Sequence, residues 1–168
     1  MRIVFLSYSD FKGGASMAAH SIYKSLSSKN SYFLSSENKY KKSIKVFNIV
    51  GIAHIFFLRI IEKILISLFS KKKYHQSLNI FSALSYRAIR KFKPDIINLH
   101  WINRSTISLN ELIKFKELTV ISLHDMWFLN STEHYFNKQN NNDNFLSRYC
   151  WKLKKIFLYK KNVFFIAH

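Results

Sequence analysis

Short apolar runs alternate along the chain with longer segments in which apolar residues recur at helical spacing. Each run is four to six residues long, rich in β-branched side chains and bounded by polar residues, which is typical of buried parallel strands. The clearest runs are Ile3–Leu6, Asp95–Leu99, Thr119–Leu123 and Asn162–Ala167, with a more polar one at Ser31–Ser35. Val46–Val50 is a further candidate for a short strand.

Helical spacing follows most of these runs. The predicted helices cover Ala15–Lys29, Gly51–Phe69, Leu78–Phe92, Leu109–Phe115 and Phe145–Lys161. Pro94 stops the third of them, because proline cannot continue a helix. Strands that alternate with helices predict an α/β fold, with one parallel sheet flanked by helices and joined by right-handed crossovers. A chain of 168 residues is long enough for a single domain with its own core.

The most apolar segment, Gly51–Phe69, is close to the length of a membrane span. Arg59, Glu62 and Lys63 argue against a span, because charges near the middle of a bilayer are costly. These three residues share one face, so an amphipathic helix fits better. Two interpretations stay open: a core-packing helix with a solvated basic end at Ser70–Lys73, or a helix that touches an anionic membrane surface.

Composition adds a strong positive charge, with 27 Lys and Arg against 9 Asp and Glu and a net charge of +18. Such a chain is attracted to polyanions, although a compositional habit of an AT-rich genome explains the charge equally well. Cys150 is the single cysteine, so no disulfide forms within the chain, which fits a reducing compartment. The first ten residues lack a complete signal-peptide pattern. We therefore expect a cytoplasmic protein, with peripheral contact at the inner membrane face as an option.

Candidate chemistry lies where the apolar runs end. Gly13-Gly14 follows the first run and opens a helix, and its backbone N–H groups suit a phosphate. His100-Trp101 and His124-Asp125 directly follow two other strands. Ligands of parallel sheets bind outside the carboxyl ends of the strands, so these pairs predict a site at that edge. A tight turn and structural histidines are the plainer alternatives.

Other kinds of site are less well supported by the sequence. His100, His124, Asp125 and His134 are suitable metal ligands, but no HExxH or close ligand spacing is present, and we expect no metal. No GxSxG motif marks a serine hydrolase, and Cys150 lies in a predicted helix as a packing residue. Lysines spread along the chain without a nucleic-acid-binding motif, which makes nucleic acid an unlikely partner.

Several motifs together resemble a known family. They are MRIVFLSYSD at the N-terminus, GGAS opening a helix, PDIINLHW, VISLHDMW and a later His-Tyr pair at 134–135. Their order is similar to the N-terminal half of bacterial family 4 glycosyltransferases, and most similar to the branch that builds surface polysaccharides. The resemblance implies a Rossmann-like domain that holds the acceptor and faces a second, donor-binding domain across a cleft.

The resemblance also implies roles for the strand-end residues. Gly13 and Gly14 would lie against the donor diphosphate. His124 would face the reacting sugar as the catalytic residue, with Asp125 fixing its loop. The family transfers a hexosyl group from a nucleotide-diphosphate sugar with retention, and it needs no cofactor beyond that co-substrate.

On the acceptor side, the resemblance places His100 and Trp101 in the lining, and His134 with Tyr135 matches the His-Tyr pair of the family. The acceptor would be a saccharide or a lipid-linked saccharide. Residues 128–133 depart from the Pro-Phe-Thr-Gly-Gly-Cys stretch of the family. We expect residues 1–168 to be the first domain only, with the donor domain on a separate polypeptide or lost. A non-catalytic module that binds a partner protein or an anionic membrane is the alternative function.

Overall fold

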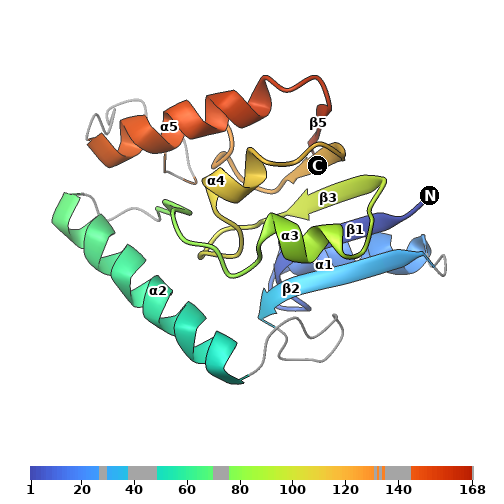
Figure 1. The fold of residues 1–168 in the computed structure, drawn as a ribbon, viewed down its shortest axis with the longest axis horizontal. Helices are drawn as coiled ribbons and strands as arrows, with labels where there is room; N and C mark the ends of the chain where they lie inside the picture. Colours follow the sequence, from blue (N-terminus) through green and yellow to red (C-terminus); the bar gives the residue numbers. More distant parts are fainter. Residues whose placement is uncertain are drawn as a thin grey trace.

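The computed structural model describes residues 1–26, 30–37, 49–69, 76–130, 132, 134 and 145–167. The described strands form one parallel sheet: β1 Ile3–Ser9, β2 Ser31–Glu37, β3 Ile96–His100, β4 Leu118–Leu123 and β5 Val163–Ala167. The described helices are α1 Gly14–Ser25, α2 Ile49–Phe69, α3 Tyr86–Arg90, α4 Leu109–Leu112 and α5 Phe145–Leu158. The predicted α/β class, a Rossmann-like parallel sheet flanked by helices, is therefore confirmed (Figure 1).

The strands lie in the order β2-β1-β3-β4-β5, and each neighbouring pair is parallel. From β1 the chain crosses to β2 on one side and later returns to β3 on the other side of β1. The boundary between β1 and β3 is thus the point where the winding reverses. Open parallel sheets bind ligands outside the strand ends at such a point, because the flanking connections diverge there.

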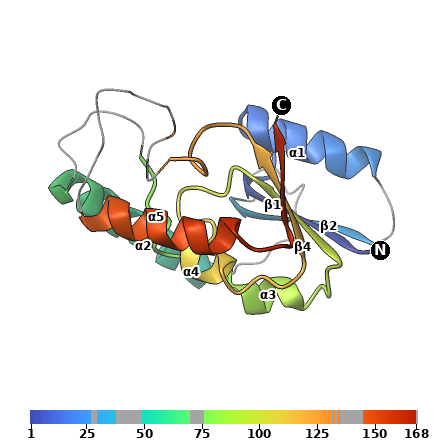
Figure 2. The same cartoon turned by 90° about the horizontal axis from the view of Figure 1, so that it is seen from above.

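Side chains of the strands alternate between two separate cores. Val4 and Leu6 belong to a large cluster on the face that carries the later helices, whereas Ile3 and Phe5 pack against α1. Figure 2 shows α1 on one side of the sheet and α3, α4 and α5 on the other. Both faces of the central strands are covered, which explains why these strands read as continuous apolar runs in the sequence.

The prediction of a helix over Leu78–Phe92 is wrong for most of its length, since only Tyr86–Arg90 is helical. The preceding segment pairs its backbone with distant groups: Ala83 N–H donates to the carbonyl of Ser105 and Leu84 N–H to that of Thr106. Apolar periodicity cannot reveal such pairing. The predicted strand Val46–Val50 is also wrong at its end, because α2 begins at Ile49, and residues 46–48 lie outside the described residues.

Helix α2 buries part of its charged face and exposes several of its apolar side chains. Glu62 is buried and Arg59 is half-buried against the body of the protein, whereas Phe56, Ile60 and Ile64 are exposed. The amphipathic helix of the prediction is present, but several of its large apolar side chains are exposed to solvent. Within the described part of the chain, we find no helix whose length and hydropathy together suit a membrane crossing.

Candidate functional site

A cleft of about 340 Å³ opens at the carboxyl ends of β1, β3 and β4. It lies at the winding reversal between β1 and β3, and it is open to solvent. Its walls come from the loop after each of the three strands and from the beginning of α1. The lining residues are Tyr8, Lys12, Gly13, Gly14, Ala15, Ser16, Trp101, Arg104, His124 and Asp125.

The two glycines form the wall that α1 contributes. Gly13 caps the helix with φ 87° and ψ 162°, a backbone region that is essentially restricted to glycine. Both glycines are exposed, and a Cβ added to either would meet no atom within 4 Å. The first turn of α1 carries no acidic residue, and Lys12 precedes it. This arrangement leaves a positive helix end open to an anion.

Backbone strain occurs on the opposite wall. Trp101 has φ 40° and Arg104 has φ 55°, both in the left-handed region that side chains other than glycine rarely adopt. Both residues follow β3 and line the cleft. Strained residues persist where the surrounding structure holds them, and they cluster at functional sites. The left-handed backbone at Trp101 and Arg104 therefore supports a functional role for these two side chains in the cleft.

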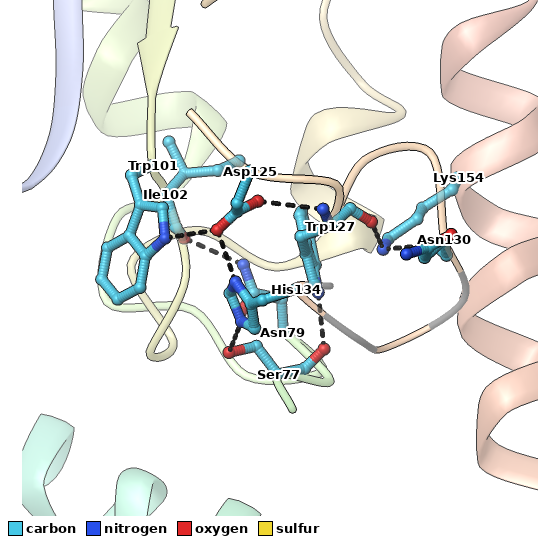
Figure 3. A network of polar contacts seen from close by, with 9 residues as sticks. All are labelled: Ser77, Asn79, Trp101, Ile102, Asp125, Trp127, Asn130, His134 and Lys154. Carbon is cyan, nitrogen blue, oxygen red and sulfur yellow. Dashed lines mark hydrogen bonds and ion pairs between the residues drawn. The ribbon is translucent and has the colours of Figure 1, made fainter. Parts of the chain in front are cut away.

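Asp125 connects the loops behind the cleft, as Figure 3 shows. Its Oδ2 accepts a hydrogen bond of 2.7 Å from Trp101 Nε1 and lies 2.5 Å from His134 Nδ1. Its Oδ1 accepts the backbone N–H of Trp127 at 2.9 Å. Burial alone raises the pKa of Asp125, but the hydrogen bonds from His134, Trp127 and Trp101 outweigh it and lower the pKa. Asp125 is therefore a charged carboxylate whose hydrogen bonds hold the loop that carries His124 in place.

Lys154 of α5 holds the same loop from behind. It is fully buried, and its Nζ donates to the carbonyl of Trp127 and, at 2.9 Å, to that of Asn130. The ammonium also lies 3.6 Å from the centre of the Trp127 ring (Figure 3). Burial lowers the pKa of Lys154 well below its usual value, because the charged form loses its hydration.

His134 lies beneath Asp125, where its Nε2 is 3.0 Å from Ser77 Oγ. Ser77, His134 and Asp125 therefore have the connectivity of a serine hydrolase triad (Figure 3). Ser77 is buried, however, and the two backbone N–H groups that follow it both donate to Glu62 Oε1. Those N–H groups are the natural oxyanion donors for such a serine, so the arrangement favours a structural network over acyl transfer.

The two strand-end histidines lie one behind the other, with His100 deeper in the protein than His124. His100 is fully buried, and its Nδ1 lies 2.9 Å from Nε2 of the half-buried His124. His100 Nε2 lies 3.3 Å from the hydroxyl of Ser122 on β4. A chain of polar atoms thus runs from the sheet interior to the cleft. The hydrogen bond between the rings couples the tautomers of the two histidines, because one ring must donate and the other accept.

Five of the predicted site residues therefore meet in one cleft: Gly13, Gly14, Trp101, His124 and Asp125. His100 and His134 do not line it but support its wall from inside the protein. Tyr135 lies outside the described residues. Cys150 is buried, and burial raises the pKa of its thiol to about 11, which confirms its expected packing role.

Sequence reasoning missed the other five residues that line the cleft, and three of them carry large polar side chains. Tyr8 lies near the end of β1, Lys12 precedes the glycine pair, and Arg104 follows Trp101 by three positions. Their closeness to strand ends was the available signal, because loops at that edge converge on one site. No pattern in the sequence indicates the left-handed backbone that holds Arg104 in place.

Among the described residues, no three His, Cys, Asp or Glu side chains gather as a group that could hold a metal ion. No family model, curated protein or solved structure matches the chain. Its function is therefore inferred from the cleft and from the sequence motifs.

Proposed function

We propose that this chain is the acceptor-side domain of a retaining glycosyltransferase that uses a nucleotide-diphosphate sugar. The observation that carries the proposal is the meeting of the open α1 N-terminus with His124 and Trp101 in one cleft. A helix end suits a diphosphate, a partly exposed indole suits the face of a sugar ring, and histidine suits a hydroxyl near the reacting carbon. The order of the sequence motifs supports the same function.

In this scheme the bond between the anomeric carbon and the diphosphate oxygen breaks as a bond to the acceptor oxygen forms on the same face. The proton of the acceptor hydroxyl passes to the departing diphosphate. The N–H groups at the start of α1, with Lys12 and Arg104, stabilise the charge that develops on the leaving diphosphate. His124 orients the sugar from the loop that Asp125 and Lys154 hold in place. The remaining contacts to the nucleotide would come from a donor-binding domain.

The acceptor is a saccharide or a lipid-linked saccharide, and the protein works at the cytoplasmic face of the membrane. The exposed apolar surface of α2 and the net charge of +18 support this location, because anionic headgroups attract basic proteins that also carry apolar surface.

Gly14→Ala tests the proposal without disturbing the fold. An added Cβ at Gly14 meets no protein atom within 4 Å, and its φ is not positive. Alanine also favours the helix over glycine by roughly 0.5–1 kcal/mol. We expect the variant to keep its stability and to bind a nucleoside diphosphate about tenfold more weakly, because the methyl group occupies the space of the phosphate.

Equilibrium dialysis with a radiolabelled nucleoside diphosphate measures this effect, and Gly51→Ala in α2 is the matched control. Unchanged binding in Gly14→Ala would mean that the glycine pair serves only the turn.

A partner-binding module is the second candidate, and β5 is the observation that favours it. Phe164, Phe165 and Ile166 are consecutive and 42–52% exposed, although they belong to a strand that pairs with β4. Apolar strand surface of this kind suits a second polypeptide, such as a donor domain encoded separately. A chain that binds no nucleoside diphosphate but co-purifies in a fixed ratio with one partner would favour this candidate.

A further inference from the structure

A second cavity, of about 380 Å³, lies between α2 and the loop after β3. It shares Tyr8 and Arg104 with the first cleft, so these two residues stand between the two spaces. The rest of its lining is of two kinds. Arg59, Glu62, Lys63, Gln76 and Ser77 are polar, whereas Phe56, Ile60 and Ile66 are apolar.

Two arginines, Arg59 and Arg104, meet at the Tyr8 ring and are called the arginine pair below. The guanidinium carbon of Arg59 is 5.1 Å from the centre of the Tyr8 ring, and that of Arg104 is 5.2 Å from it. One arginine comes from α2 and the other from the loop after β3. The fold therefore brings two like charges together on one aromatic ring, which is unfavourable unless something anionic offsets it.

The hydrogen bonds of the arginine pair all go to neutral acceptors. Arg59 donates to the backbone carbonyl of Arg104 at 3.1 Å and to Ser36 Oγ at 3.2 Å, and Arg104 donates to the Tyr8 hydroxyl at 3.3 Å. Neither forms a salt bridge with a carboxylate of the described residues.

Two carboxylates lie in the neighbourhood, Glu37 and Glu62, and both act on Arg59 from a distance. Glu62 is already engaged by the N–H groups of Leu78 and Asn79 and by the hydroxyl of Ser105. Burial lowers the pKa of Arg59 more than these carboxylates raise it. Arg59, Lys63 and Arg104 line the cavity together with one carboxylate, Glu62, so its lining carries more positive than negative charge.

The apolar side of the cavity continues along α2. Phe56 and Ile60, which line the cavity, are followed at the same spacing by Ile64 and Leu68. Their exposed fractions are 65%, 40%, 51% and 72%, and we call them the α2 stripe. Residues four apart lie in line on a helix, so a continuous apolar track leads from the arginine pair to the surface.

We propose that this cavity binds a phosphate-bearing lipid, with its phosphate at the arginine pair and its hydrocarbon chain along the α2 stripe. Arginine suits the occupant because its planar fork can donate two hydrogen bonds to one phosphate. The track from the cavity explains why α2 exposes its large apolar residues. The site shares Tyr8 and Arg104 with the first cleft, but the lipid proposal holds whether or not that cleft takes part in sugar transfer.

Vesicle flotation tests this site, with phosphatidylcholine vesicles compared with vesicles that also contain phosphatidic acid, whose head group is a bare phosphate. All proteins carry Gly14→Ala, so that phosphate binding in the first cleft does not contribute. We expect preferential binding to phosphatidic acid, reduced about tenfold or more in Arg59→Gln/Arg104→Gln, because each arginine near such a surface contributes on the order of one kcal/mol. Arg87→Gln/Lys152→Gln removes the same charge from exposed positions elsewhere and should change binding by no more than about twofold. An equal loss in both double variants would overturn the proposal.

A second variant covers the case in which the arginine variant fails to fold. Ile64→Ser/Leu68→Ser changes exposed apolar residues that lie outside the cavity lining. It should weaken vesicle binding but preserve the binding of soluble dihexanoyl phosphatidic acid, measured by calorimetry. Vesicle binding that is unaffected by this variant would overturn the lipid assignment. So would binding of soluble phosphate compounds without any binding to vesicles.

Discussion

At the scale of single residues, Asp125 links three segments of the chain through one carboxylate. It receives Trp101 from the loop after β3, the backbone of Trp127 from its own loop, and the ring of His134. The carboxylate thereby fixes the Trp101 indole and its own loop at the first cleft. The residue before it, His124, contacts His100. A catalytic role for Asp125 is not needed to explain its environment, because positioning accounts for each of its contacts.

We predict that Asp125→Asn destabilises the protein by about 1–3 kcal/mol near neutral pH, the usual cost of losing hydrogen bonds to a charged group. Because the folded state lowers the pKa of Asp125 below its ordinary 3.8, its stabilisation is present above that pH and lost as the pH falls through the folded-state pKa. Urea denaturation at about pH 7 and about pH 3 should show a smaller acid-induced loss in the variant than in the wild type.

Asp95→Asn is the matched control, since its side chain is 51% exposed and directly precedes β3, at the opposite end of the strand from the cleft. An acid-induced loss of the same size in wild type and Asp125→Asn would contradict the role of Asp125.

At the scale of elements, α2 is attached to the domain chiefly through polar contacts. Glu62 accepts the N–H groups of Leu78 at 2.8 Å and Asn79 at 2.9 Å, and it accepts the hydroxyl of Ser105. Arg59 adds contacts to Arg104 and Ser36. Apolar packing against the core comes from Ile55, Leu65 and Ile66. Removing one buried acceptor should therefore loosen the helix as a unit.

Glu62→Gln should destabilise the protein by about 1–3 kcal/mol, because an amide cannot accept all three hydrogen bonds at this buried position. We expect faster hydrogen exchange throughout α2, while the strands keep their protection. Glu117→Gln, whose carboxylate is 3.1 Å from the Tyr86 hydroxyl, should leave exchange in α2 unchanged. Equal protection of α2 in the wild type and Glu62→Gln would show that apolar packing alone holds the helix.

The strands and the cleft edge could be predicted from sequence because each depends on a local pattern. Buried strands are continuous apolar runs, and their ends place His124 and Gly13 at one edge of the sheet. The segment before Tyr86 could not be predicted, because its backbone pairs with Ser105 and Thr106, about twenty residues away. For α2, periodicity identified the two faces but not which of them turns inward, since buried Glu62 depends on partners from distant loops.

At the scale of the whole molecule, the first cleft is open to solvent, and the second cavity adjoins it through Tyr8 and Arg104. A lipid phosphate at the arginine pair would therefore lie next to the place proposed for the diphosphate. The net charge of +18 favours both anionic ligands, although charge alone identifies neither.

We predict that residues 1–168 alone transfer no sugar, because the proposed function assigns most nucleotide contacts to a donor-binding domain. Release of nucleoside diphosphate from a panel of nucleotide sugars, with a lipid-linked acceptor present, measures this directly. Robust turnover by the isolated chain would show that the domain is complete in itself.

The central claim is that the start of α1 binds a diphosphate, and the chain offers a direct test because it has only three glycines. In protein labelled with ¹⁵N at glycine, Gly13 and Gly14 report on the cleft and Gly51 reports on α2. Assignment follows from Gly14→Ala and Gly51→Ala. On titration with a nucleoside diphosphate, we predict that the Gly13 and Gly14 amide signals shift while the Gly51 signal stays in place. If the signals of Gly13 and Gly14 do not move, or if all three move equally, the cleft is not the diphosphate site.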